Sequence, residues 1–288
     1  MKPHPGETAI QQRSGITKPL GSARATAHLP PIAADFLARQ PMLIIGAADE
    51  HGHMWAHLLT GTPGFLTAIN TAANAAVNTA TILVRDPTGA PPLHDGQEIG
   101  TLAIDPATRR RMRLNGHVTR TPDGLRINAD QVIANCPKYL QTRQLTHTDA
   151  PTTPHTTHTT ELDPDHTTWI TQADTFFLAT HTPGHGADTS HRGGNPGFIQ
   201  TPTPRRLTWP DYPGNFMYLT LGNLELNPAA GLLFLDWEHG HTLQLTGHAH
   251  TVETGTTRHI EFDIHHVITT RNASPLRWHL TGYSPFNP

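Results

Sequence analysis

Two long stretches of this chain recur in the same order, and this repetition constrains the fold more than any other feature of the sequence. The segment MLIIGAADEHGHMWAHLLTGTPGF (42–65) is followed 133 positions later, without a gap, by TFFLATHTPGHGADTSHRGGNPGF (175–198). A second pair of segments, at 99–119 and 230–250, has an offset of 131 positions. Internal similarity outranks local motif assignments, and this spacing is too long for a solenoid. We therefore predict two copies of one small β domain.

The second pair of segments carries the stronger similarity. IGTLAIDPATRRRMRLNGHVT and AGLLFLDWEHGHTLQLTGHAH are identical at six of 21 positions. The identical positions of the two copies are Gly100, Leu102, Asp105, Leu114, Gly116 and His117, and Gly231, Leu233, Asp236, Leu245, Gly247 and His248. Short, regularly spaced strands of this kind are typical of a barrel or a sandwich.

The rest of the chain fits a mainly β protein with short helices. Apolar runs bounded by turn residues predict strands, and periodic runs with capping residues predict helices. We expect strands at 42–49, 54–60, 100–105 and 111–120, a strand ending in a short helix at 123–144, helices at 30–40, 163–174 and 219–228, and an extended lead-in at 1–23. The expected domains are a first repeat with its lead-in and helix (1–145), a Thr/Pro/His-rich linker (146–160) and a second repeat (161–288).

Composition narrows the possible functions. The net charge is −3, which does not favour a nucleic-acid partner, and Cys136 is the only cysteine, so a disulfide framework is not expected. The first residues lack the apolar core of a signal peptide, and no apolar run reaches the ~18 residues of a membrane span. The 22 histidines follow a general enrichment in His, Thr and Pro, so no metal site is predicted. We expect a cytoplasmic protein with no membrane or nucleic-acid partner.

Four motifs of the second half carry a resemblance to a known family. They are ADTSHRGGNPGF, WPDYPGN, LGNLELNPAAGLLFLD and LQLTGHAH. In this order they resemble the pyridoxamine 5′-phosphate oxidase-like FMN-binding split-barrel flavoproteins. The resemblance covers 174–285 well, and covers 36–145 more faintly through the repeat and through NCPKY (135–139). It implies a duplicated split β-barrel of the FMN-binding type.

The resemblance also implies a cofactor site. In the family, FMN lies between two barrels, and its phosphate is held by basic and hydroxyl side chains of the second strand and the short helix. A guanidinium and a helix N-terminus both suit a phosphate group. The corresponding residues are Ser190, His191, Arg192 and Gly193 on the strand, Asn215 in the loop and Thr220 on the helix.

The sequence departs from the family where basic residues are common. Met217 and Gly222 stand at these positions, and Lys138 or Arg277 is a candidate to replace the missing charge. Trp278, Trp209 and Tyr212 are candidates to stack on a flavin, although aromatic residues of a β domain are more often core. Cys136 is more often a small buried residue than a reactive thiol. The run RRRMR (109–113) is expected to be a solvated hairpin.

Three functions remain open at this stage. The first is an FMN-dependent oxidoreductase acting on a small-molecule substrate, with a separate reductase as a possible electron donor and no catalytic acid or base visible. The second is a non-catalytic barrel that binds a flavin or haem, and the third is a barrel that only mediates assembly. A pseudo-dimer within one chain and a homodimer are both expected.

The two copies differ at the position of Arg192. The first copy has Leu59 in register, and an apolar side chain offers a phosphate no hydrogen-bond donor. We therefore predict one FMN per chain, and a counterpart pocket in the first half that is filled by Trp55 and Leu59.

Overall fold

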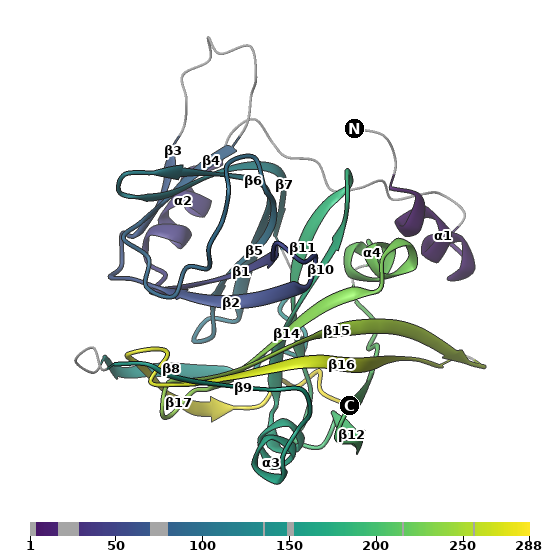
Figure 1. The fold of residues 1–288 in the computed structure, drawn as a ribbon. Helices are drawn as coiled ribbons and strands as arrows, with labels where there is room; N and C mark the ends of the chain where they lie inside the picture. Colours follow the sequence, from purple (N-terminus) through teal and green to yellow (C-terminus); the bar gives the residue numbers. More distant parts are fainter. Residues whose placement is uncertain are drawn as a thin grey trace.

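The computed structural model describes residues 4–16, 29–69, 80–134, 136–148, 153–214, 216–255 and 257–288. The described chain forms two large antiparallel sheets, one from each half (Figure 1). The strands of the first half are β1 (Met42–Ala48), β2 (Met54–Thr60), β3 (Leu66–Ile69), β4 (Ala80–Arg85), β5 (Glu98–Asp105), β6 (Arg110–Thr121) and β7 (Gly124–Ala134). Those of the second half are β10 (Thr175–Thr182), β11 (Gly186–Gly193), β12 (Gln200–Thr203), β13 (Arg206–Pro210), β14 (Ala229–Asp236), β15 (His241–Thr254) and β16 (Thr257–Arg271).

The two sheets have the same strand order. The first is β2-β1-β5-β6-β7-β4-β3, and the second is β11-β10-β14-β15-β16-β13-β12. Each strand of the first half therefore has a counterpart at the same place in the second sheet. The strands expected in the first half, at 42–49, 54–60, 100–105 and 111–120, are confirmed as β1, β2, β5 and β6.

The strand registers also correspond. Ile44 pairs with Leu102, and at the offsets read from the sequence this predicts a pairing of Phe177 with Leu233, which is present. Both halves shift register at the same place, between Asn115 and Gly116 on β6 and between Thr246 and Gly247 on β15. A bulge adds a local twist to a strand, so both sheets bend at the same point.

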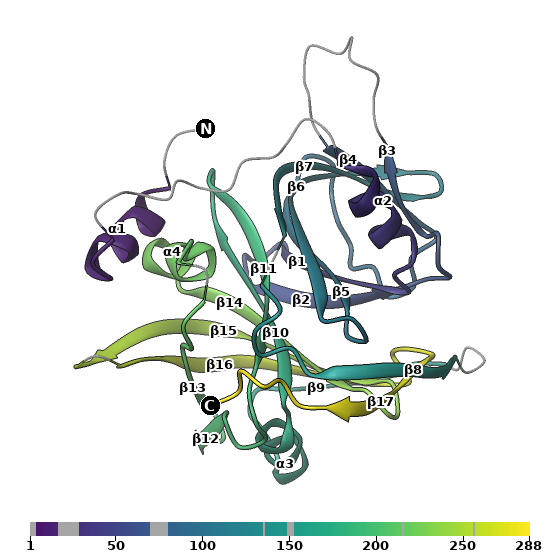
Figure 2. The same cartoon turned by 180° about the vertical axis from the view of Figure 1, so that it is seen from behind.

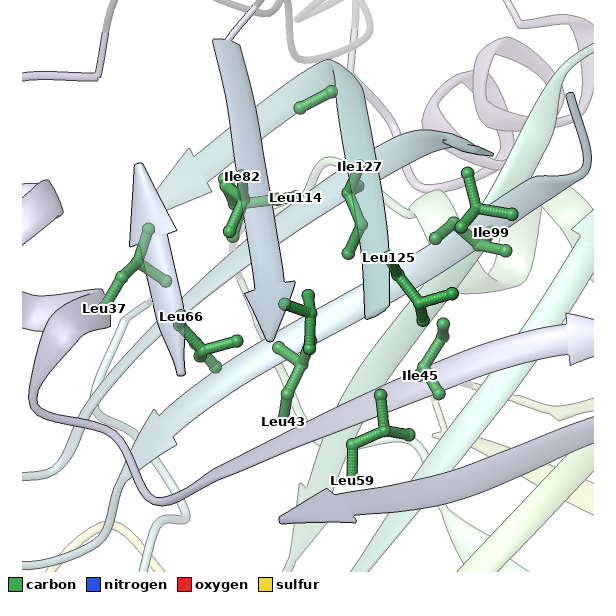
Figure 3. Close-up of a cluster of buried hydrophobic side chains, with 14 of the residues drawn as sticks. Leu37, Leu43, Ile45, Leu59, Leu66, Ile82, Ile99, Leu114, Leu125 and Ile127 are labelled. Atoms are coloured by element: carbon green, nitrogen blue, oxygen red, sulfur yellow. The ribbon is translucent and has the colours of Figure 1, made fainter. Parts of the chain in front are cut away.

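Each half buries its own hydrophobic core, and a third cluster joins the halves. The first core lies inside the first sheet, where Leu43, Ile45, Leu59 and Leu114 point toward one another (Figure 3). The third cluster brings β1, β2 and β5 against β10, β11 and β14, with Phe177 and Leu233 fully buried. The two halves thus pack against each other through a shared hydrophobic interface.

Four helices lie around the sheets in the described part of the chain, namely α1 (Pro5–Arg13), α2 (Pro31–Ala38), α3 (Pro164–Gln172) and α4 (Leu219–Leu226). The helices expected at 30–40, 163–174 and 219–228 are confirmed, and Asp163 caps α3 by accepting from the backbone N–H of His166. The extended lead-in is wrong: α1 forms there and packs on α4 of the second half (Figure 2).

Two further expectations are corrected. No helix ends the 123–144 segment among the residues described there; β7 is followed by a turn and by β8 (Thr142–Thr148). The linker at 146–160 contains the end of β8 and all of β9 (His155–Thr159), which pair with β17 (Leu276–Gly282) and β16. Threonine suits a strand, so the stretch finds β partners although its composition is that of a linker.

The halves approach each other closely at two glycines in corresponding places. A Cβ on Gly100 of β5 would lie 2.5 Å from the backbone of Asp188, and one on Gly231 of β14 would lie 2.4 Å from the carbonyl oxygen of Met54. Both distances are shorter than any tolerated contact, and in both cases the obstacle is backbone, which cannot rotate away. The interface therefore requires glycine at both positions.

We expect Gly100→Ala and Gly231→Ala each to lower the free energy of unfolding by about 1–3 kcal/mol, because an added methyl overpacks the interface. Gly214→Ala is the matched control, since nothing lies within 4 Å of its Cβ position. Urea titrations of the three variants measure the difference. Equal stabilities would contradict this account of the interface.

Candidate functional site

A basic pocket lies where the two halves meet. Its cavity volume is about 120 Å³. β6 of the first half contributes Arg111 and Arg113, and β11 of the second contributes His191 and Arg192. The segment after β7, the loop before α4 and the first turn of α4 complete the wall. The lining also includes Lys138, Tyr139, Phe198, Asp211, Tyr212, Tyr218 and Thr220.

Arg111 lies at the centre of the contact between the halves. One of its terminal nitrogens, Nη1, lies 2.7 Å from Nδ1 of His191, and Nη2 donates to the carbonyl oxygen of Cys136 at 2.7 Å. No carboxylate partner of Arg111 is found among the residues that the structure describes. Burial, and then the charge of Arg113, lower the pKa of Arg111 to about 9. The guanidinium is still charged at neutral pH, and no described carboxylate balances this charge.

The contact with Arg111 fixes the state of His191. A guanidinium has no acceptor, so Nδ1 of His191 must accept, and the proton of the neutral ring lies on Nε2. Burial first, and then the charge of Arg111, hold the pKa of His191 well below its usual range. His191 is therefore neutral at physiological pH.

Asp188 is the anionic centre behind the pocket. Its side chain is only 2% exposed and accepts two hydrogen bonds from Nη1 of Arg113, both at 3.0 Å. It also accepts from the amide of Asn115 at 3.1 Å and from the hydroxyl of Thr220 at 2.9 Å. Strand β6 of the first half and the first turn of α4 are thereby held to one buried carboxylate.

Arg192 has a different partner. Its Nη1 donates to Asp211 at 3.0 Å, and Asp211 also faces Arg258 at 3.5 Å. The Nε atoms of Arg111, Arg113 and Arg192 are all buried and have no hydrogen-bond partner in the described structure. The pocket thus combines several cations with donors that its own side chains do not satisfy.

Aromatic rings border the pocket on the side of the loop before α4. The ring centroids of Tyr139 and Tyr212 are 5.2 Å apart, and those of Tyr212 and Phe198 are 6.4 Å apart. The hydroxyl of Tyr139 donates to the carbonyl of Pro213 at 3.0 Å. These rings join the segment after β7 to the second half and offer a flat apolar surface beside the cations.

The pocket brings together five of the residues predicted from the sequence. They are His191, Arg192, Gly193, Thr220 and Lys138. Ser190 lies behind them, 1% exposed, and its hydroxyl donates to the carbonyl of Leu178. The hydroxyl of Thr220 donates to Asp188, so Thr220 helps to hold this carboxylate in place. Asn215 lies outside the described residues.

Two predicted residues lie elsewhere. Arg277 and Trp278 are on β17, where Arg277 donates to the carbonyl of Ser274 and Trp278 packs edge-on against Trp237. Gly193 is required for a reason other than a ligand, because a Cβ there would lie 2.0 Å from the carbonyl oxygen of Tyr139. Of the other candidates, Tyr212 borders the pocket, Trp209 is core and 1% exposed, and Cys136 is exposed.

The absence of a basic residue at position 222 of α4 has a structural explanation. A Cβ on Gly222 would lie 2.6 Å from the backbone nitrogen of Glu7, because α1 covers this face of α4. Gln11 of α1 also donates to the carbonyl of Met217 at 3.3 Å. An arginine at position 222 would displace α1.

The charge comes instead from Arg111 and Arg113, which the sequence interpretation assigned to a solvated hairpin. That interpretation is wrong for these two residues. Alternation along a strand places 111 and 113 on one face, and this spacing was the signal available in the sequence. That the face is covered by β11 follows only from the docking of the two halves.

The three arginine positions have different residues at their counterparts on β2 of the first half and β15 of the second. By strand register, Leu59 corresponds to Arg192, Gln244 to Arg113 and Thr242 to Arg111. Leu59 points into the first core (Figure 3), so it does not fill a counterpart pocket, and Trp55 lines an open cavity. The predicted plugging by these two side chains is therefore wrong. The neighbouring Leu58 packs instead in the cluster between the halves.

No family model matches the chain, and no curated protein matches it. Among solved structures, HupZ of Group A Streptococcus is 10% identical and aligns over 37% of this chain and 98% of its own, with a TM-score of 0.30. A provisionally named pyridoxamine 5′-phosphate oxidase of Lactobacillus delbrueckii is 14% identical over 38% of this chain and 94% of its own, with a TM-score of 0.30. An FAD-binding protein of Mycobacterium smegmatis is 12% identical over 40% and 98%, with a TM-score of 0.27.

The described residues contain neither a membrane-spanning helix nor a cluster of metal ligands. None of the helices is long and apolar enough to cross a membrane. Within the same residues, no three His, Cys, Asp or Glu side chains are grouped so as to hold a metal ion.

Removing Asp188 should destabilise the protein strongly, because Arg113 would keep a largely buried charge without its partner. We expect Asp188→Ala to lower the free energy of unfolding by about 3–5 kcal/mol. Asp263→Ala is the control: it breaks the pair with Arg206, and because the side chains of Arg206 and Asp263 are 43% and 41% exposed, its effect should be much smaller. Chemical denaturation of both variants tests the contrast.

The stability should also fall in acid because of a partly buried histidine in the first half. Burial lowers the pKa of His57 from 6.5 to about 4. The unfolded state then binds the proton more readily than the folded state, so stability is full above about pH 6.5 and is lost as the pH falls toward 4. The loss for this group is about 3 kcal/mol.

His57→Gln should flatten this part of the profile of unfolding free energy against pH. His51→Gln, on an exposed turn, serves as the control and should leave the wild-type slope unchanged. A slope in His57→Gln as steep as that of the wild type would contradict the assignment to His57.

Proposed function

We propose that this protein is a flavoprotein that binds FMN through the basic pocket between its two halves and acts as an oxidoreductase on a small molecule. The observation that carries the proposal is the convergence of Arg111 and Arg113 from one half with Arg192 from the other. All three carry a buried Nε donor without a hydrogen-bond partner in the described structure. A phosphate group supplies the oxygens that such donors lack.

The proposal includes a duplicated split barrel. The shared strand order, the shared register and the coincident bulges support two copies of one unit. A pocket at the boundary of two such units agrees with the family resemblance of the sequence, which implies a flavin held between two barrels.

The size of the cavity supports an arrangement in which only the phosphate end is enclosed. A volume of about 120 Å³ is small for a whole cofactor, because ligand pockets are commonly ≈ 300–1,000 Å³. A ring system would then lie against the aromatic side of the pocket, where Tyr139, Tyr212 and Phe198 lie. Aromatic faces bind flat ligands by offset or edge contacts.

The protein's own residues would position and polarise this ligand. FMN supplies electron or hydride transfer when it is bound. Arg111 and Arg113 would hold the anionic group, Asp188 and Asn115 would keep Arg113 in place, and neutral His191 would present its Nε2–H as a donor. The carbonyl of Cys136 and the ring of His191 hold Arg111 where it lies.

Several parts of the proposal concern the protein's setting. A separate reductase is the proposed electron donor, a homodimer the proposed assembly and the cytoplasm the proposed location. The alternative, a barrel that binds a flavin or haem without catalysis, is distinguished by colour and turnover: a Soret band indicates haem, and flavin absorbance near 450 nm without turnover indicates a carrier.

The binding site is tested by titrating the apoprotein with FMN. Arg111→Ala should weaken binding about 10–150-fold, the value of a lost charge-assisted hydrogen bond. Arg205→Ala is the control, because Arg205 is exposed and pairs with Glu161 away from the pocket. Equal affinities of the Arg111→Ala variant and the wild type would exclude the site.

The stoichiometry of FMN gives a separate test. Because the counterpart positions hold Leu59 on β2 and Thr242 and Gln244 on β15 in place of the three arginines, we expect one FMN per chain. Flavin released from the saturated protein, measured against protein concentration, gives the ratio. A value near two would show that the first half binds FMN as well.

A further inference from the structure

A second and larger cavity lies on the first-half side of the interface. Its volume is about 990 Å³. It is bordered by β2, by the 91–97 segment before β5, and by β9 and β16 of the second half. Two of these elements are counterparts of elements around the basic pocket, since β2 corresponds to β11, and the segment before β5 to the segment before β14.

Six histidines line the cavity (His51, His53, His57, His94, His158 and His266), but among the described residues no permanently cationic side chain does so. None of the described residues that line it is lysine or arginine, and two of them, Asp49 and Glu50, are acidic. Gln244, which replaces Arg113 by register, contacts the strand that forms the floor: its amide donates to the carbonyl oxygen of Ala56 at 2.8 Å. The cavity therefore lacks the guanidinium groups that would hold a phosphate in the basic pocket.

The floor and one wall of the cavity suit a flat apolar molecule. Trp55 lines the cavity, and its indole N–H donates to Asp49 at 3.0 Å, which fixes the ring. Pro91, Pro92 and Leu93 also line the cavity and add apolar surface. Asp49 also accepts hydrogen bonds from the backbone N–H groups of the following turn. Its charge is therefore already stabilised by hydrogen bonds within the protein.

One lining residue supplies a defined polar group. The side-chain amide of Gln244 donates to Nδ1 of His57 at 3.1 Å, so the neutral ring of His57 carries its proton on Nε2. The lowered pKa of His57 agrees with this state. His57 can therefore donate one hydrogen bond to a ligand carbonyl or ring nitrogen, but it cannot balance a negative charge.

We propose that this cavity, lined by Trp55, His57 and the 91–93 segment, is a second binding site that takes an uncharged, flat aromatic heterocycle. Its volume lies at the upper end of the range for small-molecule pockets, ≈ 300–1,000 Å³. The two sites of the chain then select ligands by charge: the arginine pocket takes an anionic group, and the cavity on the other side takes a neutral ring.

Riboflavin and FMN are a matched pair of probes, because they differ only in the phosphate. Riboflavin should bind the full-length protein at the Trp55 cavity with quenching of its fluorescence, and excess FMN should not displace it. Trp55→Ala should weaken riboflavin binding roughly tenfold, the effect of losing a stacking partner. The same variant should bind FMN as the wild type does.

Two other variants separate this proposal from that of the basic pocket. Thr159→Trp places a bulky ring at the cavity from exposed strand β9, without altering the core, and should also weaken riboflavin binding. Arg111→Ala should leave riboflavin binding at the cavity unchanged, whether or not FMN binds elsewhere.

The proposal is overturned if riboflavin does not bind, if FMN displaces it, or if Trp55→Ala and Thr159→Trp both leave its affinity unchanged. Loss of FMN binding alone, with riboflavin still bound and sensitive to Trp55→Ala, would contradict the function proposed for the arginine pocket and support the second site.

Discussion

The ion pair between Asp188 and Arg113 is the interaction on which the rest of the structure depends. A carboxylate that is 2% exposed needs a cation and further donors, because an unpaired buried charge costs several kcal/mol. Its partners come from β6 of the first half and from α4 of the second. Docking of the halves, placement of α4 and assembly of the basic pocket are therefore one event, and a half on its own would lack the partners of Asp188.

The same event leaves the pocket unbalanced in charge. Asp188 balances Arg113, and Asp211 lies between Arg192 and Arg258, but Arg111 faces only a carbonyl and a neutral histidine. Desolvation without a counter-charge lowers the pKa of Arg111. An anion in the pocket would reverse this penalty, so the ligand contributes the charge that the folded chain does not provide.

The repeat predicted more of the fold than of the site. Offsets of 133 and 131 positions were enough to predict the pairing of Phe177 with Leu233, because register follows from matching two copies. The site depends on contacts between segments that no local pattern relates. Thr220 lies where it was predicted, but its hydroxyl donates to Asp188. Helix α1 covers Gly222 through a close backbone contact, which hydrophobic periodicity does not reveal. Burial of Arg111 and Arg113 likewise follows from docking, while their spacing only places them on one face.

The residues required for docking of the two halves are distinct from the residues that give the pocket its charge. Gly100 and Gly231 occupy corresponding positions and are both needed where the sheets approach, so the interface constrains the halves equally. Arg111, Arg113 and Arg192 have no basic counterparts, so the charge of the site is confined to one side. An arginine in place of Leu59 would enter the first core, where no described carboxylate takes part in the packing. A second anion site would thus require repacking of the first half, whereas an uncharged ligand beside Trp55 requires none.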